Sequence, residues 1–408
     1  MKELLRNKYL SRIGPFIDDY ETIKVLTGVR RCGKSTILKQ ICRGLQERGV
    51  PRSNLVHINL DSKKLRKIKD VDSLEALVDS MMPEKDGQRY LFIDEIQNVK
   101  GFEELINAYR EEGVSVFITG SNSYLLSGEL VTKLTGRYVE FQILPFMLSE
   151  IRDLRELNGQ DFDARSEFSD YLYLGGYPKR FQYPDRDAQV LYIRSVIAES
   201  ITKDIIAKRK IKNRPLLEKM INFLISTPGA KISSTSIRDY IRSENIRTTY
   251  QTVNKYLDII FSSKLVSKCE RYSIVGKKTM KTLYKAYVAD PALHAVYPDM
   301  RRKLMMGRMM ENIVYNELVS RGYDVTVGKL REKEVDFVVS RDFRIAYVQV
   351  AYVIDGDDTD ERGIGPLLSI RDNYPKYIIS MDPICMDDRG IRRISLVDDF
   401  LLGDKFTV

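Results

Sequence analysis

A glycine-rich turn between a short apolar run and a helical pattern constrains the fold of this 408-residue chain most strongly. The apolar run is Ile23 to Leu26, the helical pattern extends from Thr36 to Gly44, and the turn reads Gly28-x-x-x-x-Gly33-Lys34-Ser35. Glycines at this spacing let the backbone turn tightly and direct its N–H groups at phosphate oxygens, beside the positive end of the helix. This complete Walker A pattern predicts an α/β domain built on a parallel sheet.

The same turn supplies the candidate nucleotide-binding residues. Lys34 is expected to reach the β and γ phosphates, and the Ser35 hydroxyl is expected to be a ligand of Mg²⁺. The predicted cofactors are therefore ATP and Mg²⁺. The full predicted set for the nucleotide is Gly28, Arg30, Arg31, Gly33, Lys34, Ser35 and Thr36.

A second apolar run, from Tyr90 to Ile93, ends in the adjacent carboxylates Asp94 and Glu95. Alone, such an ending is common. Together with the Walker A turn, about sixty residues earlier, it predicts a Walker B strand. Asp94 would hold Mg²⁺ together with Ser35, and Glu95 would orient or deprotonate the attacking water.

Two further positions complete the predicted catalytic set of Lys34, Glu95, Thr119 and Arg137. Thr119 ends a third apolar run, Val114 to Thr119, and with Ser121 it is a candidate sensor of the γ-phosphate. A simple polar turn explains these residues nearly as well. Arg137 could reach a nucleotide on a neighbouring subunit of a homo-oligomer, whereas the competing interpretation is an exposed surface arginine.

Composition narrows the class of protein. The length predicts two or three domains. No stretch approaches the roughly 18 uncharged apolar residues that a spanning helix needs, and the charged start has no signal-peptide core, so a cytoplasmic protein without a membrane partner is expected. The four cysteines form no CxxC pair and there are only two histidines, which argues against a zinc site, a disulfide framework and a Ser-His-Asp triad.

Positive charge is concentrated in one segment. Residues 201–290 hold 19 Lys and Arg against 7 Asp and Glu, whereas the whole chain has a net charge of +9, so the remainder is slightly acidic. A basic block of this kind is typical of proteins that bind nucleic acid. A solvated, lysine-rich surface is the alternative.

Several motifs together resemble a family of prokaryotic AAA+ ATP-binding proteins with a C-terminal domain of unknown function. They are the Walker A turn, Asp94-Glu95-Ile96-Gln97, Thr119-Gly-Ser-Asn-Ser, Gly136-Arg137, Leu144-Pro145-Phe146 with Ser149-Glu150, and Gly175-Gly176-Tyr177-Pro178. The resemblance covers essentially the whole chain. It implies a P-loop AAA+ domain at 1–150, a helical connector or lid at 151–209, a winged helix-turn-helix module at 210–300 and an α/β nuclease-like domain at 301–408.

The basic segment itself predicts three helices and a hairpin. The helices begin near Pro215, Ser233 and Thr248, and the hairpin strands lie on either side of Val275 to Lys278. In a winged helix, the third helix and the wing contact DNA, although such modules also bind proteins. The candidate residues for double-stranded DNA are Thr248, Tyr250, Gln251, Asn254, Lys255, Lys277 and Lys278.

The C-terminal segment resembles the core of PD-(D/E)xK nucleases, in which a helix glutamate and a strand aspartate precede an acid-x-Lys strand. Glu311 and Asp336 match, but Gln349 replaces the acid and Ala351 stands where the lysine should be. We therefore expect a degenerate site without nuclease activity, with Lys376 as a candidate migrated lysine. A strand whose polar residues merely point outward is the simpler interpretation of Glu334 and Asp336.

These features favour an ATPase that hydrolyses ATP with Mg²⁺ and couples nucleotide state to a basic DNA-binding module. Two alternatives remain open from the sequence. One is a signalling NTPase switch that binds a protein partner, and the other is an ATP-linked nuclease.

Overall fold

A computed structural model describes residues 2–82, 86–120, 134, 136–207, 211, 213–296, 302–352, 364–383 and 387–408. It divides into two compact units. The N-terminal unit comprises residues 5–144 and 262–264, and the second unit comprises residues 1–4, 145–261 and 265–408. Within the described ranges, no helix has both the length and the apolar character required to cross a membrane.

The N-terminal unit contains a parallel sheet of five strands in the order β2-β3-β4-β1-β5. Its central strands are continuous apolar runs because both faces of a parallel sheet are covered; every residue of β1 and β4 is buried. The strands are β1 (Ile23–Thr27), β2 (Leu55–Asn59), β3 (Arg89–Asp94), β4 (Val114–Thr119) and β5 (Tyr138–Gln142).

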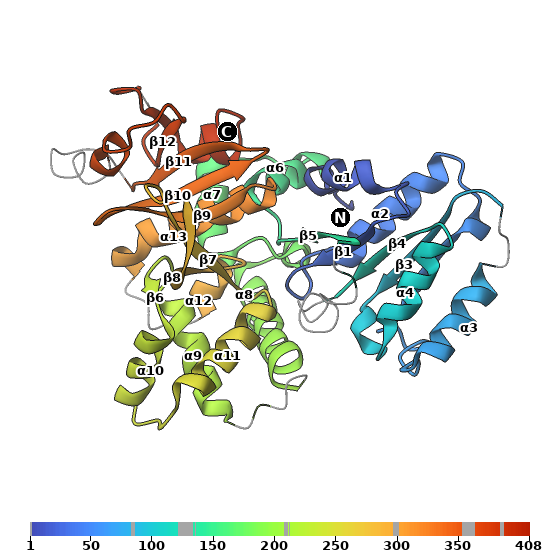
Figure 1. The fold of residues 1–408 in the computed structure, drawn as a ribbon. Coiled ribbons are helices and arrows are strands. Elements are labelled where there is room, and N and C mark those ends of the chain that lie inside the picture. Colours follow the sequence, from blue (N-terminus) through green and yellow to red (C-terminus); the bar gives the residue numbers. More distant parts are fainter. Residues whose placement is uncertain are drawn as a thin grey trace. The chain divides into compact units, whose positions relative to one another are not determined.

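Helices cover this sheet (Figure 1). Helices α3 and α4 share a buried apolar core with the strands, in which Leu74 and Phe102 take part. The sequence marks the start of α3 because the Asp70 carboxylate accepts the N–H of Ser73, which caps the helix. The helices and 3-10 turns are α1 (Asn7–Ile13), η1 (Gly14–Phe16), α2 (Lys34–Glu47), η2 (Arg52–Asn54), α3 (Val71–Met81), η3 (Ile96–Asn98) and α4 (Phe102–Glu111).

The second unit begins with a helical region. Aspartates or other polar residues cap several of its helices: Asp163 accepts from Ser166, Asp185 from Ala188, and Ser233 from Ser236. The helical elements are α6 (Leu148–Leu157), α7 (Ala164–Leu174), η5 (Pro178–Gln182), α8 (Arg186–Glu199), η6 (Ser200–Ala207), α9 (Arg214–Ser226), α10 (Ser234–Ser243), α11 (Tyr250–Ser262), α12 (Ala292–Val296), α13 (Arg302–Ser320) and η7 (Leu396–Leu401).

A mixed sheet of eight strands, in the order β13-β12-β11-β10-β9-β7-β8-β6, completes this unit (Figure 1). The hairpin β7–β8 continues directly into the C-terminal strands because β7 pairs in parallel with β9, Arg271 lying opposite Val327. Residues of the predicted winged-helix and nuclease-like segments therefore share one sheet. The strands are β6 (Lys231–Ile232), β7 (Val266–Ser273), β8 (Lys278–Val288), β9 (Asp324–Leu330), β10 (Lys333–Arg341), β11 (Arg344–Val350), β12 (Lys376–Ser380) and β13 (Arg392–Ser395).

The Gly175-Gly176 motif is explained by close packing inside the second unit. A Cβ atom on Gly175, whose φ is +62°, would lie 1.6 Å from Oδ1 of Asp290, and one on Gly176 would lie 1.8 Å from the carbonyl oxygen of Phe146. The backbone approaches its neighbours this closely because it is hydrogen-bonded to them: Gly176 N–H donates to Asp290 at 2.7 Å, and the Gly176 carbonyl accepts from Phe146 N–H at 2.8 Å. Only glycine fits at these positions.

Candidate functional site

Three strand ends meet at one edge of the N-terminal sheet. Strand β4 lies between β1 and β3, with Thr119 opposite Leu26 and Ile118 opposite Ile93. The turn after β1, the Asp94 carboxylate at the end of β3 and the Thr119 hydroxyl at the end of β4 are therefore neighbours. Ligands of open α/β sheets bind at this carboxyl edge.

The turn after β1 has the backbone that phosphate binding needs. Gly28 and Gly33 have φ values of +144° and +108°, and a Cβ on Gly28 would lie 2.1 Å from the carbonyl oxygen of Ile143. Gly33 is the N-cap of α2, so free N–H groups of that helix face the turn. The buried Lys34 ammonium donates to the carbonyls of Gly28 at 2.9 Å and Val29 at 3.0 Å. It is thus held inside the loop by neutral acceptors.

The side chain of Arg6 holds this turn through hydrogen bonds to backbone carbonyls, and no sequence motif predicts this role. Its guanidinium is buried and donates to the carbonyl of Cys32 at 2.9 Å and to that of Leu144 at 3.0 Å. The guanidinium also lies over the Tyr9 ring, 4.7 Å from its centroid. Arg6 therefore ties the phosphate turn to the end of the unit.

The Thr119 hydroxyl joins the two acidic residues of the Walker B strand. It donates to Oδ1 of Asp94 and accepts the backbone N–H of Glu95 at 3.2 Å. Asp94 is buried, and Glu95 has a left-handed backbone with φ of +58°. The Glu95 carboxylate accepts a hydrogen bond from the side-chain amide of Gln97, a residue of the same sequence motif for which the sequence predicts no role. Thr119 thus holds the backbone of Glu95, and Gln97 holds its carboxylate.

The donor set at this edge suits Mg²⁺. The Ser35 hydroxyl and the Asp94 carboxylate offer oxygen donors, and Mg²⁺ commonly takes one or two protein oxygens together with water and phosphate. Among the described residues, no group of three or more His, Cys, Asp or Glu side chains forms a metal site by itself. A protein site of two oxygens that relies on bound phosphate is compatible with that finding.

The remaining predicted residues lie on two edges of the sheet: Arg30, Arg31 and Thr36 belong to the turn and the start of α2, whereas Arg137 precedes β5 at the amino edge, where its carbonyl accepts from Ile23 N–H at 2.8 Å. Arg30 and Thr36 are half-buried, and Arg31 is exposed with φ of +63°. Arg137 is about half exposed and donates to Oδ1 of Asn107 at 3.1 Å. Ser121 lies outside the described residues.

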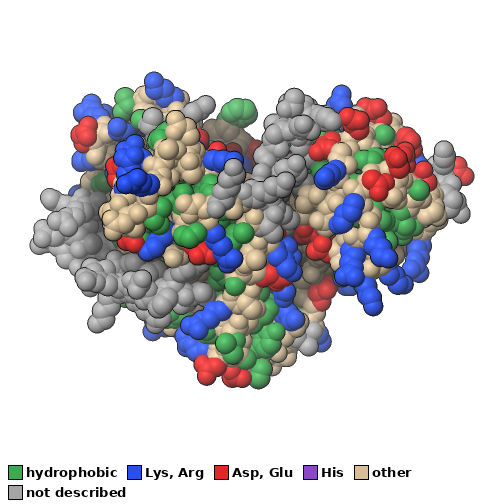
Figure 2. Space-filling model, turned by 90° about the horizontal axis from the view of Figure 1, so that it is seen from below, with side chains coloured by type: hydrophobic (Ala, Val, Ile, Leu, Met, Phe, Trp, Pro, Cys, Tyr) green, Lys and Arg blue, Asp and Glu red, His purple; other side chains and the backbone are tan. Residues whose placement is uncertain are grey.

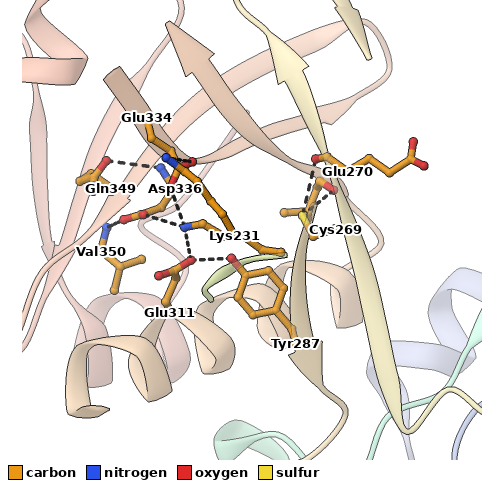
Figure 3. Close-up of polar contacts among 11 residues, drawn as sticks. Lys231, Cys269, Glu270, Tyr287, Glu311, Glu334, Asp336, Gln349 and Val350 are labelled. Atoms are coloured by element: carbon orange, nitrogen blue, oxygen red, sulfur yellow. Dashed lines mark hydrogen bonds and ion pairs between the residues drawn. The ribbon is translucent and has the colours of Figure 1, made fainter. Parts of the chain in front are cut away.

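A second group of charged side chains is buried in the eight-stranded sheet (Figure 3). The Lys285 ammonium, on β8, lies 2.7 Å from Glu311, 3.1 Å from Glu334 and 3.4 Å from Asp336. Lys231 contacts Glu334 at 3.2 Å. Further hydrogen bonds fill the rest of the cluster: the Tyr287 hydroxyl donates to Glu311, Val350 N–H donates to Asp336, and Asp336 N–H donates to Gln349. We call this group of residues the acid cluster.

Burial governs protonation in the acid cluster. Desolvation and the neighbouring Asp336 raise the pKa of Glu311 to about 7, and desolvation likewise raises the pKa of Asp336. Burial lowers the pKa of Lys285, but the three carboxylates outweigh it and raise that pKa above its ordinary value. Lys285 therefore remains charged and neutralises part of the cluster.

The expectation that Lys376 replaces the missing lysine is wrong. The Lys376 ammonium donates to the carbonyls of Asp372 at 2.7 Å and Tyr374 at 3.3 Å. Lys285 contacts the acids instead. No local sequence pattern marks this lysine, because it precedes Glu311 in the chain and lies on β8. That strand shares a sheet with β10 only through the pairings of β8 with β7, β7 with β9 and β9 with β10. Glu334 also joins the cluster and does not point simply outward.

The predicted DNA-binding residues are divided between surface and interior. Tyr250, Gln251 and Lys255 of α11 are exposed, as are Lys277 and Lys278 at the hairpin. Asn254 is half-buried, and its Oδ1 accepts from the hydroxyl of Ser234. The Thr248 hydroxyl oxygen is buried. On the face in Figure 2, Lys and Arg side chains form several separate groups, with acidic side chains between some of them.

Comparison with known proteins agrees with the geometry of the N-terminal unit. A family model described as an AAA domain matches residues 20–152, so this unit is a nucleotide-binding ATPase domain of the AAA class. A model for a domain of unknown function, DUF8612, matches residues 165–302. An uncharacterized protein of Haemophilus influenzae is 35% identical over 380 residues, which cover 92% of both chains. The chain belongs to the same family as that protein.

More distant similarities extend to archaea and to solved structures. The uncharacterized protein MJ1544 of Methanocaldococcus jannaschii is 26% identical over 92% of this chain and 85% of its own. The ORC2 protein of Aeropyrum pernix, in ADPNP–ADP complexes, is 16% identical with a TM-score of 0.37, covering 73% of this chain and 92% of its own. DnaA of Aquifex aeolicus, bound to AMPPCP, is 12% identical with a TM-score of 0.34, covering 63% and 87%.

Proposed function

We propose that this protein binds ATP with Mg²⁺ and hydrolyses the bond between its β and γ phosphates at the sheet edge formed by β1, β3 and β4. The observation that carries the proposal is the Thr119 hydroxyl, which bonds to Asp94 and to the backbone of Glu95 beside the glycine turn. In this proposal the phosphate sensor Thr119 is hydrogen-bonded both to the metal ligand Asp94 and to the backbone of the base Glu95.

Each residue has a distinct role in this proposal. Bound Mg²⁺ supplies charge neutralisation to the phosphates, and Ser35 and Asp94 would hold it. The Lys34 ammonium leaves its carbonyl acceptors for phosphate oxygens. The Glu95 carboxylate, held by the Gln97 amide, orients the attacking water and accepts its proton. Arg137 would serve a nucleotide on a neighbouring copy of a homo-oligomer.

We further propose that the basic segment is a winged helix that binds double-stranded DNA. Its elements follow in the order α9-β6-α10-α11-β7-β8, and β8 pairs with both β6 and β7. The exposed residues Tyr250, Gln251 and Lys255 would face the DNA groove, with Lys277 and Lys278 on the phosphate backbone. A protein partner for the same surface is the competing proposal.

For the acid cluster we propose a structural role, without nuclease chemistry. One oxygen of each of Glu311, Glu334 and Asp336 contacts the Lys285 ammonium, so a divalent cation would have to compete with this lysine for those oxygens. The arrangement does not fit a metal ion in addition to this lysine. No catalytic step follows from it.

Two variants of the nucleotide site test the proposed hydrolysis. Glu95→Gln removes the base but keeps the Gln97 contact, so turnover should fall about 10²- to 10⁴-fold while ATP binding persists. Lys34→Ala removes the cation facing the phosphates and should abolish ATP binding or lower turnover at least about a hundredfold. Phosphate release and ATP calorimetry measure the two effects.

Exposed residues of α2 supply matched controls. Lys39→Ala and Glu47→Gln remove the same groups from the outer face of that helix. Both should turn over like the parent protein. Parental turnover in Glu95→Gln would show that the water is activated by another residue, and unchanged binding and turnover in Lys34→Ala would refute the assignment of the phosphate turn.

A further inference from the structure

A large hollow lies beside the β7–β8 hairpin, and its lining shares no residue with the candidate nucleotide site or the acid cluster. Its volume is about 850 Å³, within the usual range for ligand pockets. It is lined by the tip of the β7–β8 hairpin, the turn between β9 and β10, part of β11, and residues 368–372 and 374. The two turns lie together because Ile274 N–H donates to the carbonyl of Lys329 at 2.9 Å. We call this hollow the hairpin pocket.

Tyrosine side chains form one part of the hairpin pocket. Tyr272, Tyr347 and Tyr374 all line it. Tyr374 is 42% exposed, and its ring meets that of the buried Tyr347 edge to face, with 6.4 Å between centroids. The Tyr347 hydroxyl donates to Asp372 at 2.7 Å, which fixes the inner ring. An exposed ring held by a fixed neighbour is a platform for stacking planar groups.

Cations surround these rings. Lys277, Arg331 and Arg371 are exposed, and among the described residues none of the three is within ion-pair distance of an acid. Lys277 and Arg331 sit at the two turns with φ values of +46° and +53°. Lys333 is a fourth lining cation and donates to the Ser369 hydroxyl at 3.0 Å. These side chains offer four positive charges to a ligand.

Acidic side chains do not cancel this charge. Only Glu332 and Asp372 line the hairpin pocket. Asp372 already accepts from the Tyr347 hydroxyl and the Tyr374 N–H, and it pairs with Lys376 at 3.6 Å. A smaller adjoining hollow of about 420 Å³ adds Arg392, and also Arg389, which is paired with Asp388 at 3.0 Å. The described walls therefore combine a positive surplus with exposed aromatic surface.

We propose that the hairpin pocket binds single-stranded DNA, with a base stacked on Tyr374 and the backbone phosphates on Arg331, Arg371 and Lys277. Cations that follow the backbone, interleaved with aromatic rings that stack on bases, are the two elements by which proteins bind single strands. The volume exceeds what a lone phosphate needs and admits nucleotides. Duplex DNA has no exposed base faces, so the tyrosines select against it. The site is independent of nucleotide hydrolysis.

Fluorescence anisotropy with an oligothymidylate of about 12 nucleotides tests this site in the whole chain. Tyr374→Ala should raise Kd about fivefold or more, whereas Tyr374→Phe, which keeps the ring, should bind like the parent protein. Arg331→Glu combined with Arg371→Glu should raise Kd more than about tenfold.

Arg186→Glu reverses the charge of an exposed arginine on α8, outside the lining of the hairpin pocket, and should leave Kd unchanged. Thermal unfolding verifies that each variant is folded, and ATP turnover at the parental rate separates this site from the nucleotide site. The proposal is overturned if the parent protein binds no oligothymidylate or if Tyr374→Ala binds it as tightly as the parent. An equal loss of oligothymidylate affinity in Arg186→Glu and in the variant carrying both Arg331→Glu and Arg371→Glu would also overturn the proposal.

Discussion

Two lysines contact the same carboxylate but differ in burial, which makes them a matched pair at the residue scale. Lys285 has 4% of its side chain exposed and Lys231 has 48%, and both approach Glu334. Lys285→Met keeps most of the volume but leaves buried carboxylates without their cation, so we expect a loss of about 3–5 kcal/mol in the free energy of unfolding. Lys231→Met should cost less than about 1 kcal/mol. Denaturant unfolding at pH 8 measures both.

The same pair tests the structural role of the acid cluster. Equal effects of the two substitutions would contradict the central position given to Lys285. If Mn²⁺ or Mg²⁺ raised the Tm of Lys285→Met but not that of the parent protein, the carboxylates would be able to hold a metal once the ammonium is gone. Metal-dependent DNA cleavage by the parent protein, lost in Asp336→Asn, would refute the structural role.

At the scale of elements, the strand-turn-helix from β1 to α2 contains two glycines in opposite situations. A Cβ on Gly28 would collide with the carbonyl of Ile143, whereas one on Gly44, inside α2, meets nothing within 4 Å. Gly28→Ala should therefore distort the turn and lower ATP affinity at least about tenfold. Gly44→Ala should leave ATP binding intact and stabilise the protein by about 0.5–1 kcal/mol.

Calorimetry with ATP and Mg²⁺ gives the first effect, and thermal unfolding gives the second. Parental ATP affinity in Gly28→Ala would show that the turn tolerates displacement from Ile143, and the phosphate-binding geometry would then need another explanation.

At the scale of the whole molecule, the proposal joins an ATPase to a DNA-binding segment. ATP turnover should rise when duplex DNA is added, and DNA affinity should fall steeply with salt because binding releases counterions. Replacing Lys255, Lys277 and Lys278 together by Glu should weaken duplex binding more than about tenfold, make the salt dependence shallower, and leave basal turnover unchanged.

Turnover that ignores DNA while responding to a protein partner would favour the signalling switch over the DNA-associated ATPase. Retention of duplex binding by the triple variant would place the DNA surface elsewhere on the chain. Gel mobility and phosphate release, measured on the same preparations, distinguish these results.

Local patterns were sufficient for several elements. The apolar runs predicted β1, β3 and β4 nearly to the residue, and Ser233 correctly marked the start of a helix, because capping and hydrophobic burial act within a few residues. The contacts of Arg6 and Gln97 had no comparable signal. Each depends on backbone positions that are fixed only when distant segments pack together.

Sequence by itself determined the chemistry of the phosphate turn, since a Walker motif needs only consecutive residues and the helix that follows them. Tertiary structure alone decided where the buried lysine of the acid cluster comes from and which rings and cations line the hairpin pocket. Both depend on the parallel pairing of β7 with β9, a contact between residues more than fifty positions apart. The hydrophobic pattern of a strand sets which of its faces is buried, but which distant strand it pairs with is decided only when the whole unit packs.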